Sequence, residues 1–282
     1  MKKILHMSDL HVGYADFDLR FRRITDEIIS RYRGQAPDFV IVITGDLANN
    51  ANKVESFHKV KQGLEALRRA GFAHVLVVPG NHDHGTGKLV DERFGEIFQE
   101  IFYGRRIEFP KLDIIDEVAF LGLNSMEEEL HWHDRFWAEG DLGMPQLRRL
   151  ETALLSPAVR ACKKRVIYLH HHPFKWRPFH ELKDSKELKK VLISAMNDGV
   201  SIDALLFGHN HQGKAHNGEW GIPRCYDAGT ATLKPRPKYL DWFHWYQIQA
   251  STRIIDLANE DAASDRVLFF NGTTGGGHEK AE

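Results

Sequence analysis

Five short segments of this chain contain residue types that bind divalent metal ions. They combine aspartate, asparagine and histidine, and a run of apolar residues precedes each of them. Because such runs are typical of buried strands, we expect each segment to follow the carboxyl end of a strand, where the loops of a sheet form binding sites. The segments are Asp9-Leu10-His11, Gly45-Asp46, Gly80-Asn81-His82-Asp83, His170-His171-His172-Pro173 and Gly208-His209-Asn210-His211.

These residue types favour a centre that holds two metal ions. Two-metal sites hold their ions about 3.5–4 Å apart and need a carboxylate that bridges them, with imidazole or amide oxygen donors around it. Asp9 and His11 are two residues apart, as are His209 and His211, so each pair projects to one side of an extended strand end. A pair with this spacing can bind one ion or divide between two. The amide oxygen of Asn81 would add a neutral donor.

The order of the five segments resembles the signature of the calcineurin-like metallophosphoesterases. That signature reads D-x-H, GD, GNH-(D/E), H-x-P and GH-x-H, and all five blocks occur here in that order. Single blocks arise by chance, whereas five ordered blocks are specific. The segment Gly140-Asp141-Leu142-Gly143 is also similar to a family segment. The resemblance implies an α/β fold in which two mixed β-sheets pack face to face with flanking helices, an αββα sandwich.

The resemblance also implies which residues hold two divalent ions, of manganese, iron or zinc. Asp46 would bridge the ions, and His171 is assigned because it is the histidine of H-x-P. His170 and His172 fit that pattern less well, and remain open between packing and a hydrogen-bonding role behind the ligands. The implied donors are Asp9, His11, Asp46 and His211 for one ion, and Asp46, Asn81, His171 and His209 for the other.

Two further residues of the third block are implied as catalytic residues. His82 would face the substrate and protonate the leaving oxygen while a metal-bridging hydroxide attacks phosphorus in line. Asp83 would support the ligands, although an aspartate that stabilises a turn explains it nearly as well.

The residues around Asp46 narrow the implied reaction to phosphodiester hydrolysis. Leu47-Ala48-Asn49-Asn50 follows it, which differs from the V-D-R-G of protein serine/threonine phosphatases. The remaining pattern is similar to bacterial cyclic-nucleotide and glycerophosphodiester phosphodiesterases. We therefore predict an enzyme, a phosphodiesterase with a small phosphodiester as its substrate. A nuclease, a phosphomonoesterase and a scaffold without catalytic activity remain alternatives.

Composition sets limits on the class of protein. The chain has 282 residues, of which 42% are hydrophobic. We therefore predict one domain over residues 1–274, followed by a disordered tail at 275–282. A formal net charge of −1 argues against a protein built mainly to bind nucleic acid. Cys162 and Cys225 form no disulfide framework, which favours a cytoplasmic protein. The sequence contains no apolar run long enough to span a membrane and makes no prediction of oligomeric state.

Apolar periodicity predicts alternating strands and helices before a region of short strands. An Asp184 and Glu187 capping box predicts the start of the last helix. Predicted strands are 3–7, 39–44, 75–78, 113–115, 118–123, 165–169 and 203–207, and then 224–226, 245–249, 253–257 and 267–270. Predicted helices are 17–32, 53–70, 89–103, 144–155 and 184–196.

Two segments are candidates for contact with substrate. Residues 125–139 contain Trp132 and Trp137 and could form a lid or pocket wall, although an interface or a solvated helix is equally compatible. Residues 234–238 read as a loop stiffened by proline, on which Lys234 and Arg236 could hold a phosphate, although such charge runs are usually solvated.

Overall fold

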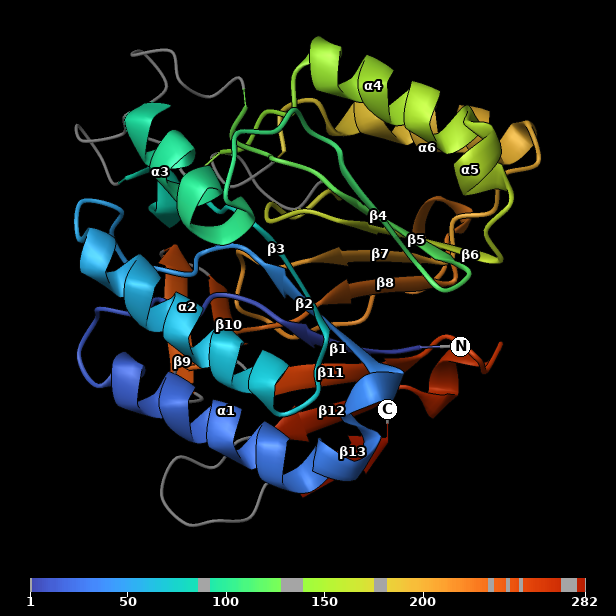
Figure 1. Ribbon diagram of the computed structural model, residues 1–282. Helices are drawn as coiled ribbons and strands as arrows, with labels where there is room; N and C mark the ends of the chain where they lie inside the picture. The colour runs from blue at the N-terminus through green and yellow to red at the C-terminus, as the bar shows by residue number, and fades with distance from the viewer. Residues whose placement is uncertain are drawn as a thin grey trace.

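Two β-sheets stacked face to face form the centre of the structure, a computed structural model (Figure 1). It describes residues 2–85, 92–127, 139–174, 182–232, 236–241, 244–248, 251–269 and 278–281. The first sheet has the strand order β13-β12-β11-β1-β2-β3. Its strands are β1 (Lys3–Met7), β2 (Phe39–Thr44), β3 (His74–Val78), β11 (Ser251–Asp256), β12 (Arg266–Phe269) and β13 (His278–Ala281).

The second sheet has the order β4-β5-β6-β7-β8. Its strands are β4 (Lys111–Ile115), β5 (Val118–Gly122), β6 (Lys164–Tyr168), β7 (Ala204–Phe207) and β8 (Arg224–Asp227). Each sheet combines parallel and antiparallel pairs, because β11 runs antiparallel to β1 and β4 runs antiparallel to β5. The predicted fold class, two mixed sheets with flanking helices, is therefore confirmed.

Helices cover the outer face of each sheet (Figure 1). The first sheet packs against α1 (Phe17–Tyr32), α2 (Val54–Arg69) and α3 (Glu92–Tyr103). The second packs against α4 (Met144–Leu155), α5 (Pro157–Arg160) and α6 (Ser185–Asn197). Short 3-10 helices are η1 (Arg33–Asp38), η2 (His82–His84), η4 (Glu219–Gly221) and η5 (Ala262–Ser264). Among the described helices, none has the length and apolar character needed to cross a bilayer.

Strand β2 shows why these apolar runs become buried strands. Val40 and Val42 point into the layer between the two sheets, whereas Ile41 and Ile43 point toward the helices. All six residues of β2 are buried. A strand covered on both faces needs apolar residues at every position, which explains why the sequence shows a continuous run and no alternation.

A buried ion pair joins the second sheet to the segment that enters β12. Arg224 of β8 donates from Nε to Oδ2 of Asp265 at 2.8 Å, and the hydroxyl of Tyr226 donates to the same oxygen at 2.6 Å. Arg224 and Asp265 are both about 1% exposed. Because each charge is paired and hydrogen-bonded, the contact fixes the C-terminal strands against β8.

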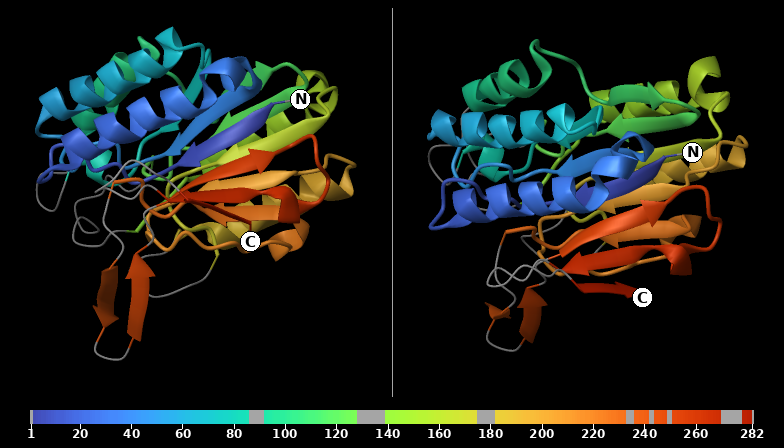
Figure 2. Two further views of the ribbon diagram at one scale, coloured as in Figure 1. Left: turned by 90° about the horizontal axis from the view of Figure 1, so that it is seen from below. Right: turned by 60° about the horizontal axis from the view of Figure 1, so that its bottom comes forward.

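Three local predictions differ from the structure. Asp184 precedes α6 as expected, but its carboxylate accepts the backbone N–H groups of Leu142 and Gly143 and no N–H of its own helix, so the capping box is wrong. Residues 236–238, expected as part of a loop, lie in β9 (Arg236–Asp241), which forms a hairpin with β10 (His244–Ile248) that projects away from the two sheets (Figure 2). Residues 278–281, expected to be disordered, pair with β12. In both of these segments backbone pairing across strands prevails over local composition.

Candidate metal centre

All five blocks lie at the carboxyl ends of strands, and both sheets contribute. Asp9 and His11 follow β1, Asp46 follows β2, and Asn81 follows β3 of the first sheet; the two histidine blocks follow β6 and β7 of the second. Backbone hydrogen bonds align the first two loops, since the N–H of Asp9 donates to Gly45 and that of His11 donates to Asp46. The stacking of the sheets therefore brings the five loops together.

One group of donor atoms lies where the first ion was predicted. The Nε2 atoms of His11 and His211 are 3.2 Å apart, and His211 Nε2 lies 3.0 Å from Oδ1 of Asp9. His11 Nε2 is 3.7 Å from Oδ2 of Asp46. Around an ion with bonds of about 2.1 Å, neighbouring donors lie about 3–3.5 Å apart. Asp9, His11 and His211 therefore form a group that fits one bound ion, and the carboxylate of Asp46 borders this group.

A second group surrounds the other oxygen of Asp46. Nε2 of His170 lies 3.5 Å from Asp46 Oδ1, 3.0 Å from Asn81 Oδ1 and 3.2 Å from Nδ1 of His209. His171 also has a ring nitrogen within 4.8 Å of those of His170 and His209. Since one carboxylate of Asp46 faces both groups, the donor set fits two ions that share it.

His170 is a candidate ligand that sequence reasoning did not select. Its Nδ1–H donates to the carbonyl of Thr44 at 2.8 Å, which leaves Nε2 directed at the second group. Metal-binding histidines usually donate their other N–H in this way. His171, the predicted ligand, contacts Oγ of Ser125 through Nδ1 at 2.7 Å. The H-x-P pattern selected His171, and the three adjacent histidines offered no other signal of which ring faces the centre, so the role of His171 stays a prediction.

Five of the candidate ligands occupy backbone conformations that residues other than glycine rarely adopt. Positive φ values of 44° to 71° occur at Asp9, His11, Asp46, His209 and His211, and at only three other described residues that are not glycine. Such conformations cost about 1–3 kcal/mol each and persist where the surrounding structure enforces them. Their concentration here shows that the loops are held in a specific geometry at the expense of local stability.

Glycine is required beside the shared carboxylate. A Cβ on Gly80 would lie 2.3 Å from Oδ1 of Asp46 and 2.5 Å from its backbone nitrogen. A Cβ on Gly208 would lie 2.5 Å from Oδ2 of Asp9. Both glycines therefore permit the close approach of one metal loop to another.

Mutual charge and burial set the protonation of these groups. Burial opposes ionisation of Asp9, but the neighbouring His211 and His170 together outweigh burial, so the pKa of Asp9 is lowered. Burial, together with the nearby His211 and His82, holds the pKa of His11 well below its usual value. A neutral imidazole beside ionised carboxylates is the state that a divalent ion requires.

His82 and Asp83 occupy different environments. The His82 side chain is 31% exposed, and its Nε2 lies 4.0 Å from Oδ2 of Asp46. Its Nδ1 donates to the carbonyl of Asn49 at 2.7 Å, so Nε2 is the atom that can exchange a proton at the centre. Asp83 is fully buried and accepts the backbone N–H groups of Leu47, Ala48 and Gly80. Asp83 therefore holds two metal loops together, and its predicted catalytic role stays a prediction.

Burial and a like charge shape the state of Asp83. Burial, followed by the carboxylate of Asp46, raises the pKa of Asp83 to about 7. Its three backbone N–H donors favour the ionised form, but they do not outweigh these effects.

The predicted substrate contacts lie largely outside the described residues. Trp132, Trp137 and Lys234 are among the residues that the structure does not describe, as are residues 128–138 of the predicted lid. Arg236 is described only as the first residue of β9. These assignments stay predictions.

Comparison with known proteins agrees with this geometry. The model of the calcineurin-like phosphoesterase family matches residues 2–213. A dimetal phosphatase from Danio rerio aligns with 95% of this chain and 94% of its own, at 12% identity and a TM-score of 0.55. A purple acid phosphatase from yellow lupin seeds aligns with 95% of this chain, at 13% identity and a TM-score of 0.59; the chain spans about half of it, 51%.

A third solved structure, described as the GAP50 anchor in the inner membrane complex of Plasmodium, aligns with 99% of this chain and 88% of its own, at 9% identity and a TM-score of 0.59. At such identities the solved structures show a shared fold. The family match covers most of the chain and includes all five blocks. This chain therefore belongs to the calcineurin-like phosphoesterase family.

Proposed function

We propose that this protein is a dinuclear metal-dependent phosphodiesterase that hydrolyses small phosphodiesters. The proposal rests on one observation: donor atoms from five loops lie around the carboxylate of Asp46. Bound there, two ions would supply Lewis acidity toward the phosphate oxygens and lower the pKa of a coordinated water.

The side chains of this protein have separate roles in such a reaction. Asp46 would set the distance between the two donor groups, and Asp83 would hold the loops that carry Asp46 and Asn81. His82, whose Nδ1–H is engaged by Asn49, would present Nε2 to the leaving oxygen and give it a proton. An alkoxide is a poor leaving group, so this proton transfer matters most for unactivated diesters.

The proposal of a small diester rests on the sequence. The chain lacks the V-D-R-G that resembles protein phosphatases, and its near-neutral net charge of −1 provides no overall attraction for a polyanion. Its GD-L-A-N-N segment is similar to that of the bacterial phosphodiesterase branch.

The test compares three substrates after reconstitution with manganese, iron or zinc. We expect bis-p-nitrophenyl phosphate to be hydrolysed with a higher kcat/KM than p-nitrophenyl phosphate or single-stranded DNA. Asp46→Asn should lose both metal and activity, with metal content measured by elemental analysis. Faster turnover of the monoester would replace the proposal by a phosphomonoesterase, and preferential DNA cleavage that falls steeply with salt would replace it by a nuclease.

A further inference from the structure

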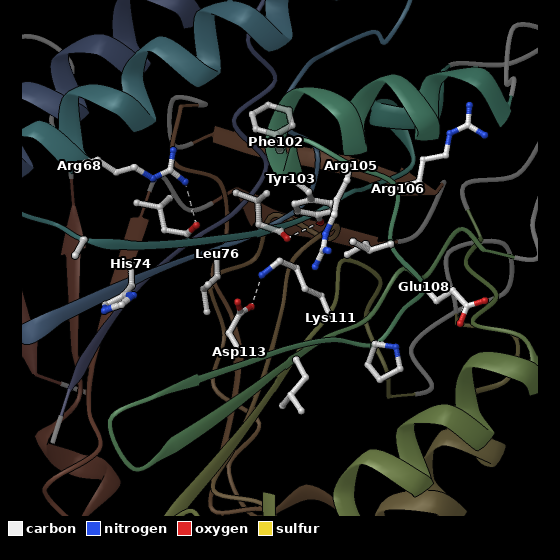
Figure 3. A pocket seen from close by; sticks show the side chains of 16 residues that line it. Arg68, His74, Leu76, Phe102, Tyr103, Arg105, Arg106, Glu108, Lys111 and Asp113 are labelled. Carbon is white, nitrogen blue, oxygen red and sulfur yellow. Dashed lines mark hydrogen bonds and ion pairs between the residues drawn. The ribbon is translucent and has the colours of Figure 1, made fainter. Parts of the chain in front are cut away.

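A second cavity lies away from the metal centre, between the free edges of the two sheets. It has a volume of about 650 Å³ and is bordered by β3, the end of α3, and the segment that leads into β4 (Figure 3). None of its lining residues belongs to the five metal-binding blocks. Its size falls within the range of about 300–1,000 Å³ that is typical of small-molecule sites.

Cationic side chains outnumber anionic ones around this cavity. Arginine and lysine contribute four lining residues, and aspartate and glutamate contribute two. The lysine is paired, since Lys111 forms an ion pair with Asp113. Of the remaining arginines, Arg106 pairs with Glu96 at 2.5 Å. Figure 3 shows Arg106 directed away from the cavity and Arg105 directed into it, beside Tyr103.

Two of the guanidinium groups form no ion pair within the described residues. Within the described residues, neither Arg105 nor Arg68 has an ion-pair partner. Arg68 makes one long hydrogen bond, 3.4 Å, to the carbonyl of Val75. A guanidinium has five N–H donors in a planar fork that matches the oxygens of a phosphate group, so both arginines have donors available to a ligand.

The edge of β3 is closed to an added strand. The carbonyls of Val75 and Val77 are occupied by Arg68 and by the hydroxyl of Tyr103, which donates at 2.9 Å. A peptide that extended the sheet would need these acceptors for its own N–H groups. On the side of β3, the cavity thus offers side-chain donors to a compact ligand and no free carbonyl at Val75 or Val77 to a peptide.

We propose that this cavity binds a small phosphorylated molecule, with Arg105 and Arg68 as its phosphate-binding residues. A phosphomonoester carries about 1.5–2 negative charges at pH 7, which matches two unpaired guanidinium groups. The site is separate from the proposed reaction, because it shares no side chain with the metal centre. It lies beside β3, the strand that leads directly to Asn81 and His82.

The experiment measures binding of adenosine 5′-monophosphate to the full chain by isothermal titration calorimetry, in the metal-loaded protein and in Asp46→Asn. The second protein removes the metal centre as a phosphate site and prevents turnover. We expect Asp46→Asn to retain one binding site. In that background, Arg105→Gln should weaken binding about tenfold or more, because a charge-assisted contact is lost. Arg105→Lys should be intermediate, since it keeps the charge without the fork.

Arg23→Gln is the matched control, because Arg23 is an exposed arginine of α1 outside the cavity. It should bind as tightly as the parent, and thermal unfolding should show that all variants fold. The proposal is overturned if Asp46→Asn abolishes binding, or if Arg105→Gln binds as tightly as its parent. Tighter binding of succinate than of the nucleotide would also overturn it, in favour of a dicarboxylate site. Each of these results would overturn the second site and leave the proposed phosphodiesterase standing, because the substrate comparison tests that activity separately.

Discussion

Individual side chains decide which atoms of the histidine-rich block reach the metal centre. His170 contacts Thr44 through one ring nitrogen and points the other at Asp46 and Asn81. Burial lowers the pKa of His170, but the carboxylates of Asp46 and Asp9 outweigh burial and raise it. The ring therefore already occupies a place where positive charge is favourable, as it would be for a cation bound to Nε2.

Single substitutions of the three adjacent histidines should show which of them binds a metal ion. We expect His170→Ala to reduce metal content from about two equivalents to about one, because the second donor group loses its central nitrogen. His172→Ala is the control, since the ring nitrogens of His172 contact Phe174 and His216. Elemental analysis after dialysis measures both. If His171→Ala loses the metal and His170→Ala keeps it, the ligand is the residue that the H-x-P pattern selects.

His82 should affect chemistry and not metal content. We expect His82→Ala to keep both ions while kcat falls by about 10²–10⁴, the range typical of a lost general acid. The loss should be smaller for a p-nitrophenyl ester, whose leaving group needs little protonation. A variant that binds only one ion would contradict the assignment and make His82 a ligand.

At the scale of elements, the loops between strands and helices control the site. Gly80 allows the third loop to touch Asp46, and no other residue type fits that space without displacing the shared carboxylate. We expect Gly80→Ala to lower metal content and activity together. Gly34→Ala is the matched control, because a Cβ there meets no atom within 4 Å. Normal metal binding by Gly80→Ala would show that the loop can move without cost.

The sequence predicted most elements because they are regular and buried. β1, β2, α1 and α4 have the predicted boundaries, since their apolar periodicity continues to the last residue of each element. The conformations of the loops could not be predicted, because positive φ at Asp46 or His209 is imposed by contacts between distant segments. Distant contacts also explain the wrong prediction for Asp184. It was expected to cap its own helix, whereas the N–H groups that it accepts lie 41 and 42 residues away.

At the scale of the whole molecule, the buried layers make stability depend on pH. Burial, followed by the charge of Arg253, lowers the pKa of His6 from 6.5 to about 3. The folded protein therefore binds fewer protons than the unfolded chain between these values. The resulting stability is present above pH 6.5 and is lost as the pH falls toward 3, by up to about 1.4 kcal/mol per pH unit.

This contribution can be isolated by substitution. We expect the unfolding free energy of the native protein to fall more than that of His6→Gln as the pH falls from 6.5 to 4.5. Urea unfolding of chelator-treated protein at several pH values measures it. His58→Gln, which changes an exposed histidine of α2, should follow the native protein. Parallel curves for His6→Gln and the native protein would show that His6 is not held neutral.

Apolar periodicity could not predict which distant strands pair with one another. The short strands after residue 224 were predicted as strands, but nothing local indicates that β11 lies beside β1. The prediction of two stacked sheets did not specify which strands are neighbours.

The position of β1 has a consequence for synthesis on the ribosome. β1 leads directly to the first two candidate ligands, yet one of its edges is completed only by β11, about 250 residues later in the chain. Until residues 251–256 emerge, the nascent protein holds every candidate ligand while the backbone of its central strand remains open to pairing with another chain. A fragment that ends at residue 213, where the family match ends, would keep this open edge permanently. Chaperone protection during translation, and failure of such a fragment to stay in solution, follow from the strand order alone.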